Sequence, residues 1–259
     1  MQARHSEGVF VTEPRRARHQ RRFYDEHARD YDRWMRFYDP LMLGDARRRV
    51  CSLASGRTLE LAIGTGLNLP FYPGDVRLTG VELSPAMLAV AGQRARELGV
   101  DVELRLGDAH ALDLPCDSFD TVVSTLFFSS VPSPRQAAAE VLRVLKPGGR
   151  PLLLDHVRSP ILAVRLVERL LGPPLRRFSG CDLMRDPLDY LGAGGFVVES
   201  CRRSRLGVVL EVVAWKGSAP VQSRPRYNVG RGASRGPRAC YLGSLLWIVP
   251  TFWGARITS

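Results

Sequence analysis

Short apolar runs alternate with helical segments along most of this chain, and this alternation limits the fold more than any other feature. The runs have the length and the β-branched content of buried strands, whereas several segments between them have the apolar spacing of helices. Such an order predicts a mainly parallel sheet with helices on both faces. The expected strands are 58–63, 76–83, 102–106, 119–125, 151–155, 196–200 and 208–213, the last two antiparallel to each other, and the expected helices are 21–50, 85–98, 135–145, 160–176 and 186–191.

Two of the expected helices carry clear local signals. In the segment 85–98, Ser84 is a suitable N-cap, Pro85 fits the first helical position and Gly99 is a typical stop. The segment 21–50 has aromatic and apolar residues at three- and four-residue steps, which predicts an amphipathic helix. These residues are Phe23, Tyr24, His27, Tyr31, Trp34, Met35 and Tyr38.

The net charge of +11 is concentrated near the two ends of the chain. Six arginines lie in residues 1–22, and six more lie in residues 217–259, which contain no acidic residue. Basic ends attract phosphates or anionic lipid by Coulomb attraction, but chain ends are commonly only solvated, and the second interpretation is favoured. We therefore expect a disordered tail over 1–20, one folded domain over 21–216 and a disordered basic tail over 217–259.

The last part of the C-terminal tail, residues 241–255, is abruptly apolar. It is too short to cross a bilayer, and Pro250 interrupts it. Three interpretations stay open: a weak interfacial anchor, an aggregation-prone end, or a translated frameshift without a selected function. The third is favoured, because the tail has no acidic residue and no periodic pattern.

Cysteine usage and the N-terminal sequence favour a cytoplasmic protein. The five cysteines are odd in number, form no C-x-x-C pair and match no disulfide framework or metal site, so no metal is expected. Residues 1–20 lack the apolar core of a secretory signal, and no segment has the length of a membrane span. Peripheral contact with a membrane remains an alternative, and the sequence predicts no oligomeric state.

Three polar motifs follow three successive expected strands. The sequence ELAIGTG, Glu60 to Gly66, ends the first strand, and its glycines let the backbone approach a ligand closely. Glu82 ends the second strand, where a carboxylate can accept both ribose hydroxyls of an adenosine. Asp108 and Ala109 follow the third strand and can meet the adenine amino group and ring edge. The three motifs predict one adenosine-binding crevice at the carboxyl ends of the strands.

The glycine turn distinguishes between two adenosine cofactors. A dinucleotide fingerprint has the form G-x-G-x-x-G/A, in which the third small residue allows close packing of helix and strand. Here Gly64 and Gly66 are followed by Leu69 at that third position. The turn is therefore poor for a pyrophosphate and favours a cofactor with a methionine moiety, although an NAD-dependent oxidoreductase remains the rival enzyme.

Residues 24–216 resemble the class I S-adenosylmethionine (SAM)-dependent methyltransferases, in particular the branch of ubiquinone/menaquinone-biosynthesis and phospholipid N-methyltransferases. The resemblance rests on YDEHARDYDRW (24–34), LELAIGTGLNLPFYP (59–73), GVELSPAML (80–88), GDAHALDLP (107–115), SFDTVVST (118–125) and RVLKPGG (143–149). It implies a seven-stranded Rossmann-like sheet whose last strand is antiparallel. It also implies SAM as the cofactor, held by Glu60, Ala62, Gly64, Thr65, Gly66, Glu82, Leu83, Asp108, Ala109, Ser124 and Thr125, with Tyr24 and Tyr31 covering it.

One departure from the family pattern affects the cofactor site. The family usually has glycine at the position of Ala62. A methyl group there crowds the cofactor if the backbone needs a positive φ, and is harmless if φ is negative. A non-catalytic SAM-binding protein is therefore kept as an alternative.

His156 is the candidate catalytic residue. It follows Asp155 at the carboxyl end of the fifth expected strand, where ligands bind in such sheets. A neutral imidazole there either takes a proton from the acceptor or only shapes the pocket, and the resemblance favours the second role. Methyl transfer needs a base only when the acceptor must lose a proton, because the main requirement is alignment and exclusion of water.

The acceptor is expected to be a small, lipophilic molecule: a quinone precursor, a phospholipid head group or a secondary metabolite. The amphipathic segment 160–176 and the basic N-terminus favour it, since the segment fits either a lid or a helix at a membrane surface. No nucleic-acid partner is expected, because the chain has no N/D-P-P-Y/F motif for amino-group methylation. A Pro-Cys dipeptide with a catalytic cysteine would be the other signal, but Pro115-Cys116 lies before the fourth strand and not after it.

Overall fold

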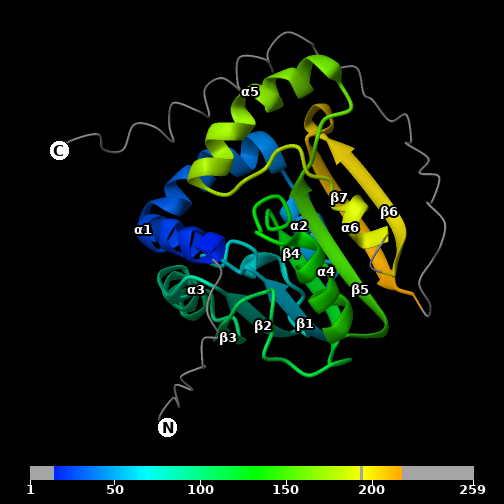
Figure 1. The fold of residues 1–259 in the computed structure, drawn as a ribbon. Coiled ribbons are helices and arrows are strands. Elements are labelled where there is room, and N and C mark those ends of the chain that lie inside the picture. Colours follow the sequence, from blue (N-terminus) through cyan, green and yellow to red (C-terminus); the bar gives the residue numbers. More distant parts are fainter. Residues whose placement is uncertain (1–14, 193–194, 218–259) are drawn as a thin grey trace.

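The computed structural model describes residues 15–192 and 195–217 and shows one seven-stranded sheet with helices on both sides (Figure 1). The strand order is β3-β2-β1-β4-β5-β7-β6, with β1 to β5 parallel and β7 antiparallel to both of its neighbours. The predicted sheet and its antiparallel last strand are confirmed. The strands are β1 (Arg57–Leu61), β2 (Arg77–Glu82), β3 (Val102–Leu106), β4 (Phe119–Thr125), β5 (Leu145–His156), β6 (Phe196–Ser204) and β7 (Val209–Lys216).

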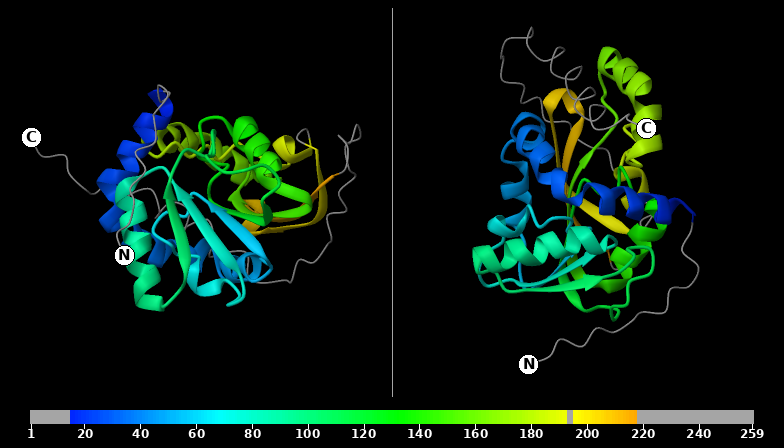
Figure 2. Two further views of the ribbon diagram at one scale, coloured as in Figure 1. Left: turned by 90° about the horizontal axis from the view of Figure 1, so that it is seen from below. Right: turned by 90° about the vertical axis from the view of Figure 1, so that its left-hand side faces the viewer.

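Alternation along the central strands divides the core between the two faces of the sheet. In β4, Val122 packs in one buried cluster and Val123 in the other, as successive side chains of a strand must. The first cluster is covered by α4 (Pro134–Val144) and α6 (Leu188–Leu191), and the second by α2 (Ala46–Cys51). Figure 2 shows helices on both sides of the twisted sheet.

Helix α3 (Pro85–Leu98) forms as its local signals predict. The Ser84 hydroxyl oxygen accepts the Met87 N–H at 3.1 Å, and Gly99 ends the helix in the left-handed conformation with φ 65°. Strand β5, by contrast, begins at Leu145 and not at Pro151 as expected. Leu145 pairs with Phe119 across a register shift in β4, and a partner that distant in sequence leaves no local signal.

Helix α1 (Arg15–Tyr38) begins earlier than the expected start at residue 21. Its first turns are held by distant partners: His19 donates from Nε2 to the carbonyl of Arg177 at 3.2 Å, and Gln20 donates to the carbonyl of Ser130 at 3.2 Å. The arginines of 15–22 therefore lie on a helix and not in a tail. The remainder of the two expected tails, 1–14 and 218–259, lies outside the described residues.

The last large helix, α5 (Leu162–Phe178), follows β5 and lies across the end of the sheet near α1 (Figure 1). It contains Pro173 and Pro174. Short helical turns complete the fold: η1 (Asp39–Leu43), η2 (Leu69–Phe71) and η4 (Arg205–Gly207). Within the described ranges, no helix combines the length and the apolar character needed to cross a bilayer.

Candidate functional site

The predicted site residues gather at the carboxyl ends of the parallel strands. The loop 62–66 follows β1, Glu82 ends β2 with Leu83 just after it, and Asp108 and Ala109 come after β3. Ser124 and Thr125 end β4, and His156 ends β5. Parallel strands that point the same way present these ends at one edge of the sheet, so the sequence motifs form one site.

The glycine loop after β1 has the left-handed backbone that its sequence suggests. Gly64 and Gly66 have φ of 59° and 79°. A Cβ on Gly66 would lie 2.8 Å from Leu69 Cδ1, so the absence of a side chain allows the close packing there. A Cβ on Gly64 would meet no atom closer than 3.9 Å, so the space in front of Gly64 is open to a ligand.

Glu82 holds this loop against the end of β2. Its side chain is buried, and its two oxygens accept the N–H groups of Gly64 at 3.0 Å and Ser84 at 2.9 Å. Burial raises the pKa of Glu82, and these backbone donors counteract the rise. Each carboxylate oxygen has two lone pairs, so both oxygens can still accept a hydroxyl of a ribose diol.

Asp108 is oriented by a histidine that the sequence analysis did not single out. His110 donates to Asp108 Oδ1 from its backbone N–H at 2.9 Å and from Nδ1 at 2.6 Å, and its Nε2 accepts the Ser133 N–H at 3.1 Å. This last bond fixes the Nδ1–H tautomer. Burial raises the pKa of Asp108, but the His110 bonds outweigh burial and leave the pKa below its usual value. Oδ2 is thereby left for an adenine amino group.

Helix α1 crosses this edge of the sheet with a repeated Tyr-Asp pair (Figure 2, right). The pairs begin at Tyr24, Tyr31 and Tyr38, and seven residues correspond to nearly two helical turns, so the three pairs share one face. Tyr24 and Tyr31, the predicted cover, have ring centroids 6.3 Å apart. Burial raises the pKa of both tyrosines, that of Tyr31 to about 12, so both hydroxyls stay protonated.

The aspartates of the same pairs anchor α1 to the strand ends. Asp25 accepts the Ser84 hydroxyl at 2.6 Å, just after β2. Asp32 accepts the Thr65 hydroxyl at 2.6 Å in the glycine loop and also pairs with Arg94 of α3. The repeat was visible in the sequence as a seven-residue period, and it was the signal that could have identified these anchors.

A buried polar network connects the segments that carry the site, and the sequence analysis missed most of it. Arg47 is buried and binds both oxygens of Asp39, at 2.7 and 3.2 Å, and it donates to Asn68 at 3.0 Å and to Thr125 at 3.2 Å. Asn68 in turn donates to Glu60 at 2.6 Å. The guanidinium therefore joins η1, the turn after the glycine loop and the end of β4.

Glu60 lies within this network, beneath the glycine loop. It accepts the Tyr72 hydroxyl at 2.8 Å besides Asn68, and its side chain is almost fully buried. Burial raises the pKa of Glu60 to about 7, although both hydrogen bonds act to lower it. Contact of Glu60 with the cofactor stays a prediction. In the structure, Glu60 binds Asn68 and Tyr72 and so supports the glycine loop.

His156 meets a tyrosine of α1 at the end of β5. The Tyr38 hydroxyl lies in hydrogen-bond contact with His156 Nε2. Burial lowers the pKa of His156 to about 4, so the imidazole is neutral near pH 7. Burial also raises the pKa of the neighbouring Asp155 to about 6, and the Asp155 oxygens accept the N–H groups of Ser129 and His156. The predicted proton acceptor is therefore a neutral side chain with a polar partner.

This edge of the sheet has the features of a site for an adenosine cofactor on a methyltransferase-like α/β fold. A family model described as "Methyltransferase domain" matches residues 59–153. Residues of this chain are 38% identical over 151 positions to a phosphatidylethanolamine N-methyltransferase of Cereibacter sphaeroides, covering 54% of this chain and 74% of that one. The chain belongs to the SAM-dependent methyltransferases, and SAM is its cofactor.

Two further similarities extend this result. A demethylmenaquinone methyltransferase of Thermus thermophilus is 34% identical over 138 residues, which cover 53% of this chain but only 60% of that relative. A SAM-dependent methyltransferase of Thermotoga maritima has a similar fold, with a TM-score of 0.61 and 20% identity over 76% of this chain and 99% of that one. The predicted family, fold, enzyme class and cofactor are confirmed, and the NAD-dependent alternative is set aside.

The residues present fit SAM. Gly64 leaves open space, Glu82 and Asp108 have unused acceptor positions, and the buried Ser124 Oγ has no hydrogen-bond partner among the described residues. When bound, SAM supplies an electrophilic methyl group on its sulfonium. The chain's own residues would then hold the adenosine, orient the methyl group toward the acceptor and exclude water from the reaction.

Ala62 has a positive φ of 52°, the case in which its methyl group matters. Because this conformation costs an L-residue about 1 kcal/mol, Ala62→Gly is expected to raise the free energy of unfolding by up to about 1 kcal/mol, measured by urea denaturation. Ala89→Gly on the exposed side of α3 is the control, and it should lower that free energy by about 1 kcal/mol. A loss of stability in both variants would contradict strain at Ala62.

The raised pKa of Glu60 makes stability depend on pH. The folded protein keeps the Glu60 proton up to about pH 7, whereas the unfolded chain releases it near the usual glutamate pKa of 4.5. The protonated Glu60 therefore contributes fully to the free energy of unfolding at low pH, and this contribution is lost as the pH rises through about 7. Relative to the parent protein, Glu60→Gln should therefore gain about 2 kcal/mol in unfolding free energy between about pH 5 and pH 7. Urea denaturation at several pH values measures this, with the exposed Glu97→Gln as control; parallel curves for Glu60→Gln and the parent would refute it.

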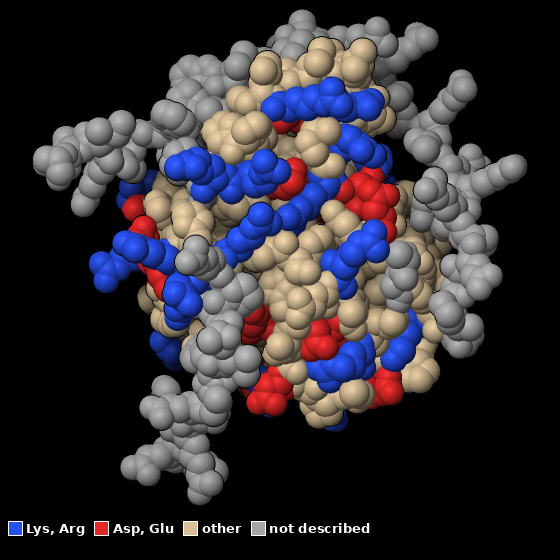
Figure 3. All heavy atoms as spheres, viewed as in Figure 1, with Lys and Arg blue, Asp and Glu red and all other residues tan. Residues whose placement is uncertain are grey.

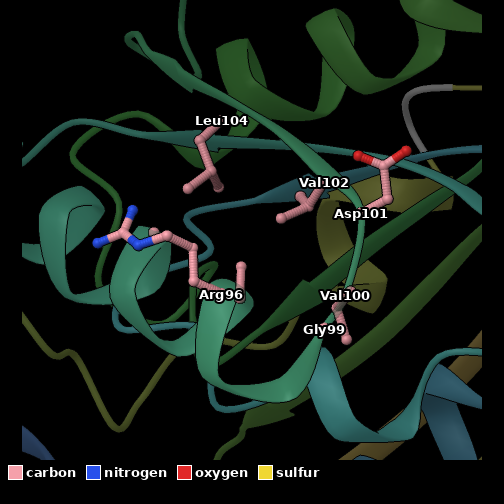
Figure 4. A pocket seen from close by; sticks show the side chains of 8 residues that line it. Arg96, Gly99, Val100, Asp101, Val102 and Leu104 are labelled. Atoms are coloured by element: carbon pink, nitrogen blue, oxygen red, sulfur yellow. The ribbon is translucent and has the colours of Figure 1, made fainter.

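A surface hollow of about 400 Å³ lies away from the candidate site. It is lined by the last turns of α3 and the start of β3, with Arg96 and Asp101 as its charged residues (Figure 4). These residues are at the amino end of β3, whereas the site motifs follow the carboxyl ends of the strands. The hollow is therefore not part of the cofactor site.

Proposed function

We propose that this methyltransferase acts on a small, lipophilic acceptor bound between α1 and the ends of β4 and β5. The observation that carries the proposal is the uncharged character of the groups there. Tyr24 and Tyr38 present hydroxyls, His156 is neutral, and burial raises the pKa of the Cys181 thiol to about 12. Such surroundings favour a neutral or apolar molecule, because these four side chains are uncharged and the neighbouring Asp155 already accepts the N–H groups of Ser129 and His156.

The proposed acceptor classes are a quinone precursor, a phospholipid head group and a secondary metabolite. Two relatives are named for phosphatidylethanolamine and for demethylmenaquinone, which supports the first two classes. Quinone precursors and phospholipids reside in membranes, so for these two classes the proposal includes peripheral contact of the protein with a lipid surface. The site residues Glu82, Asp108 and Ser124 are proposed to bind the cofactor, as argued from their open acceptor and donor positions.

The proposed role of His156 is to position the acceptor together with Tyr38. The imidazole is a weak base with its pKa near 4, so it takes a proton only from an acceptor that becomes strongly acidic as the methyl bond forms. An amine acceptor loses its proton to water after transfer and needs no base. His156 is thus compatible with nitrogen, carbon and oxygen acceptors.

The test uses SAM with a trideuterated methyl group and three acceptors: phosphatidylethanolamine, a demethylated quinol and a phenol. Mass spectrometry of the products should show the labelled methyl group on one class of acceptor and little on the others. SAM binding by calorimetry without label on any of the three acceptors would overturn the proposed acceptor class.

A further inference from the structure

Helix α5 exposes its leucines to solvent. Leu162, Leu166 and Leu170 have exposed fractions of 66%, 52% and 77% and lie at four-residue steps, so they form one stripe, called here the leucine stripe. Among the residues of α5 whose exposure is described, only Val164, Glu168 and Gly172 are buried. Packing on the sheet would place the leucines inward, so packing alone does not explain this helix.

The orientation of α5 is fixed by polar contacts on its inner side. Both oxygens of the buried Glu168 accept the Ser159 N–H, at 3.2 and 3.0 Å. The Ser159 hydroxyl donates to the carbonyl of Leu206 at 2.7 Å, which ties the start of α5 to the β6–β7 connection. These bonds turn the Glu168 carboxyl group inward and leave the leucine stripe outside. Ile161 and Leu206, 43% and 41% exposed, extend the apolar surface at the same end of the helix.

Arginines border the leucine stripe. The helix carries Arg165, Arg169, Arg176 and Arg177, against a single acidic residue, which is the buried Glu168. Helix α1 adds the basic segment 15–22, and the two helices meet where His19 donates to the carbonyl of Arg177. Figure 3 shows Lys and Arg side chains crossing the upper part of this face, where α5 lies, beside uncharged surface.

We propose that the leucine stripe of α5 docks on an anionic lipid surface. Apolar side chains framed by arginines match the two parts of such a surface, because leucines enter the boundary of the acyl chains and arginines meet anionic head groups. The charge around the stripe favours this occupant over an uncharged protein partner. The inference rests on the proposed lipophilic acceptor, since α5 directly follows the strand that ends in His156 and docking brings that end of the sheet to the membrane.

The test measures binding of the full chain to sedimenting vesicles of equimolar phosphatidylcholine and phosphatidylglycerol. The variant Leu166→Ser with Leu170→Ser should bind about 30-fold more weakly, because two leucines no longer enter the apolar region. The matched control is Leu53→Ser with Leu98→Ser, two leucines of 44% and 46% exposure elsewhere on the surface, which should bind like the parent protein. Binding to vesicles of phosphatidylcholine alone should be much weaker than binding to the anionic vesicles. This difference in affinity should be measurable without lowering the salt concentration.

Hydrogen exchange of the parent protein gives a second readout that needs no variant. Vesicles should slow exchange of the amides of α5 and leave those of α3 unchanged. Equal vesicle binding by the parent and the α5 variant, or equal binding to neutral and anionic vesicles, would overturn the docking proposal. The label-transfer assay separates the two proposals. Absent vesicle binding with intact methyl transfer rejects only the docking surface, and vesicle binding without methyl transfer to any of the three acceptors rejects only the proposed acceptor.

Discussion

Replacing Arg47 by methionine is expected to lower the free energy of unfolding by about 3 kcal/mol or more. The substitution leaves Asp39 as a poorly solvated carboxylate and removes donors from Asn68 and Thr125, and breaking a buried ion pair from one side has costs of this size. Urea denaturation followed by circular dichroism measures the loss.

The neighbouring Arg48 provides the control for this substitution. Its guanidinium lies 5.1 Å from the centre of the Phe71 ring at the exposed surface, so Arg48→Met should cost about 1 kcal/mol or less. Similar losses for the two variants would show that the buried network contributes no more than a surface contact.

The second large effect is expected on cofactor affinity. Glu82→Gln should weaken SAM binding by about 100-fold, because an amide nitrogen replaces one acceptor oxygen and faces the N–H of Gly64 or Ser84 as a second donor. Calorimetric titration with SAM measures the change, and the exposed Glu97→Gln should bind like the parent protein. Affinity within a few-fold of the parent would exclude Glu82 as a ribose ligand.

The parts of the fold that the sequence predicts are those with local signals. Helix α3 has a cap, an apolar stripe and a stop within its own segment, and β4 has a run of β-branched residues. The start of β5 depends on the pairing of Leu145 with Phe119, and the first turns of α1 depend on partners at Ser130 and Arg177. Contacts between residues far apart in the chain leave no signal in the sequence around either residue.

The same distinction applies to the candidate site. The glycine loop, Glu82 and Asp108 follow strands and could be located from the chain order alone. The Arg47 network could not, because a guanidinium between Asp39, Asn68 and Thr125 depends on η1, the turn after the glycine loop and the end of β4 coming together. The Tyr-Asp repeat of α1 lies between these cases: its period was visible, but its function as an anchor needed the positions of Ser84 and Thr65.

We therefore expect one helix, α1, to control access to both ligands. While Asp25 holds Ser84 and Asp32 holds Thr65, α1 lies over the predicted adenosine position, and its Tyr38 contacts His156 on the proposed acceptor side. Departure of the demethylated product is then expected to need these bonds to open, and the same opening would expose the acceptor side. We expect the rate of turnover to be limited by how often α1 separates from the strand ends. Cofactor exchange and acceptor entry would then share a single slow step.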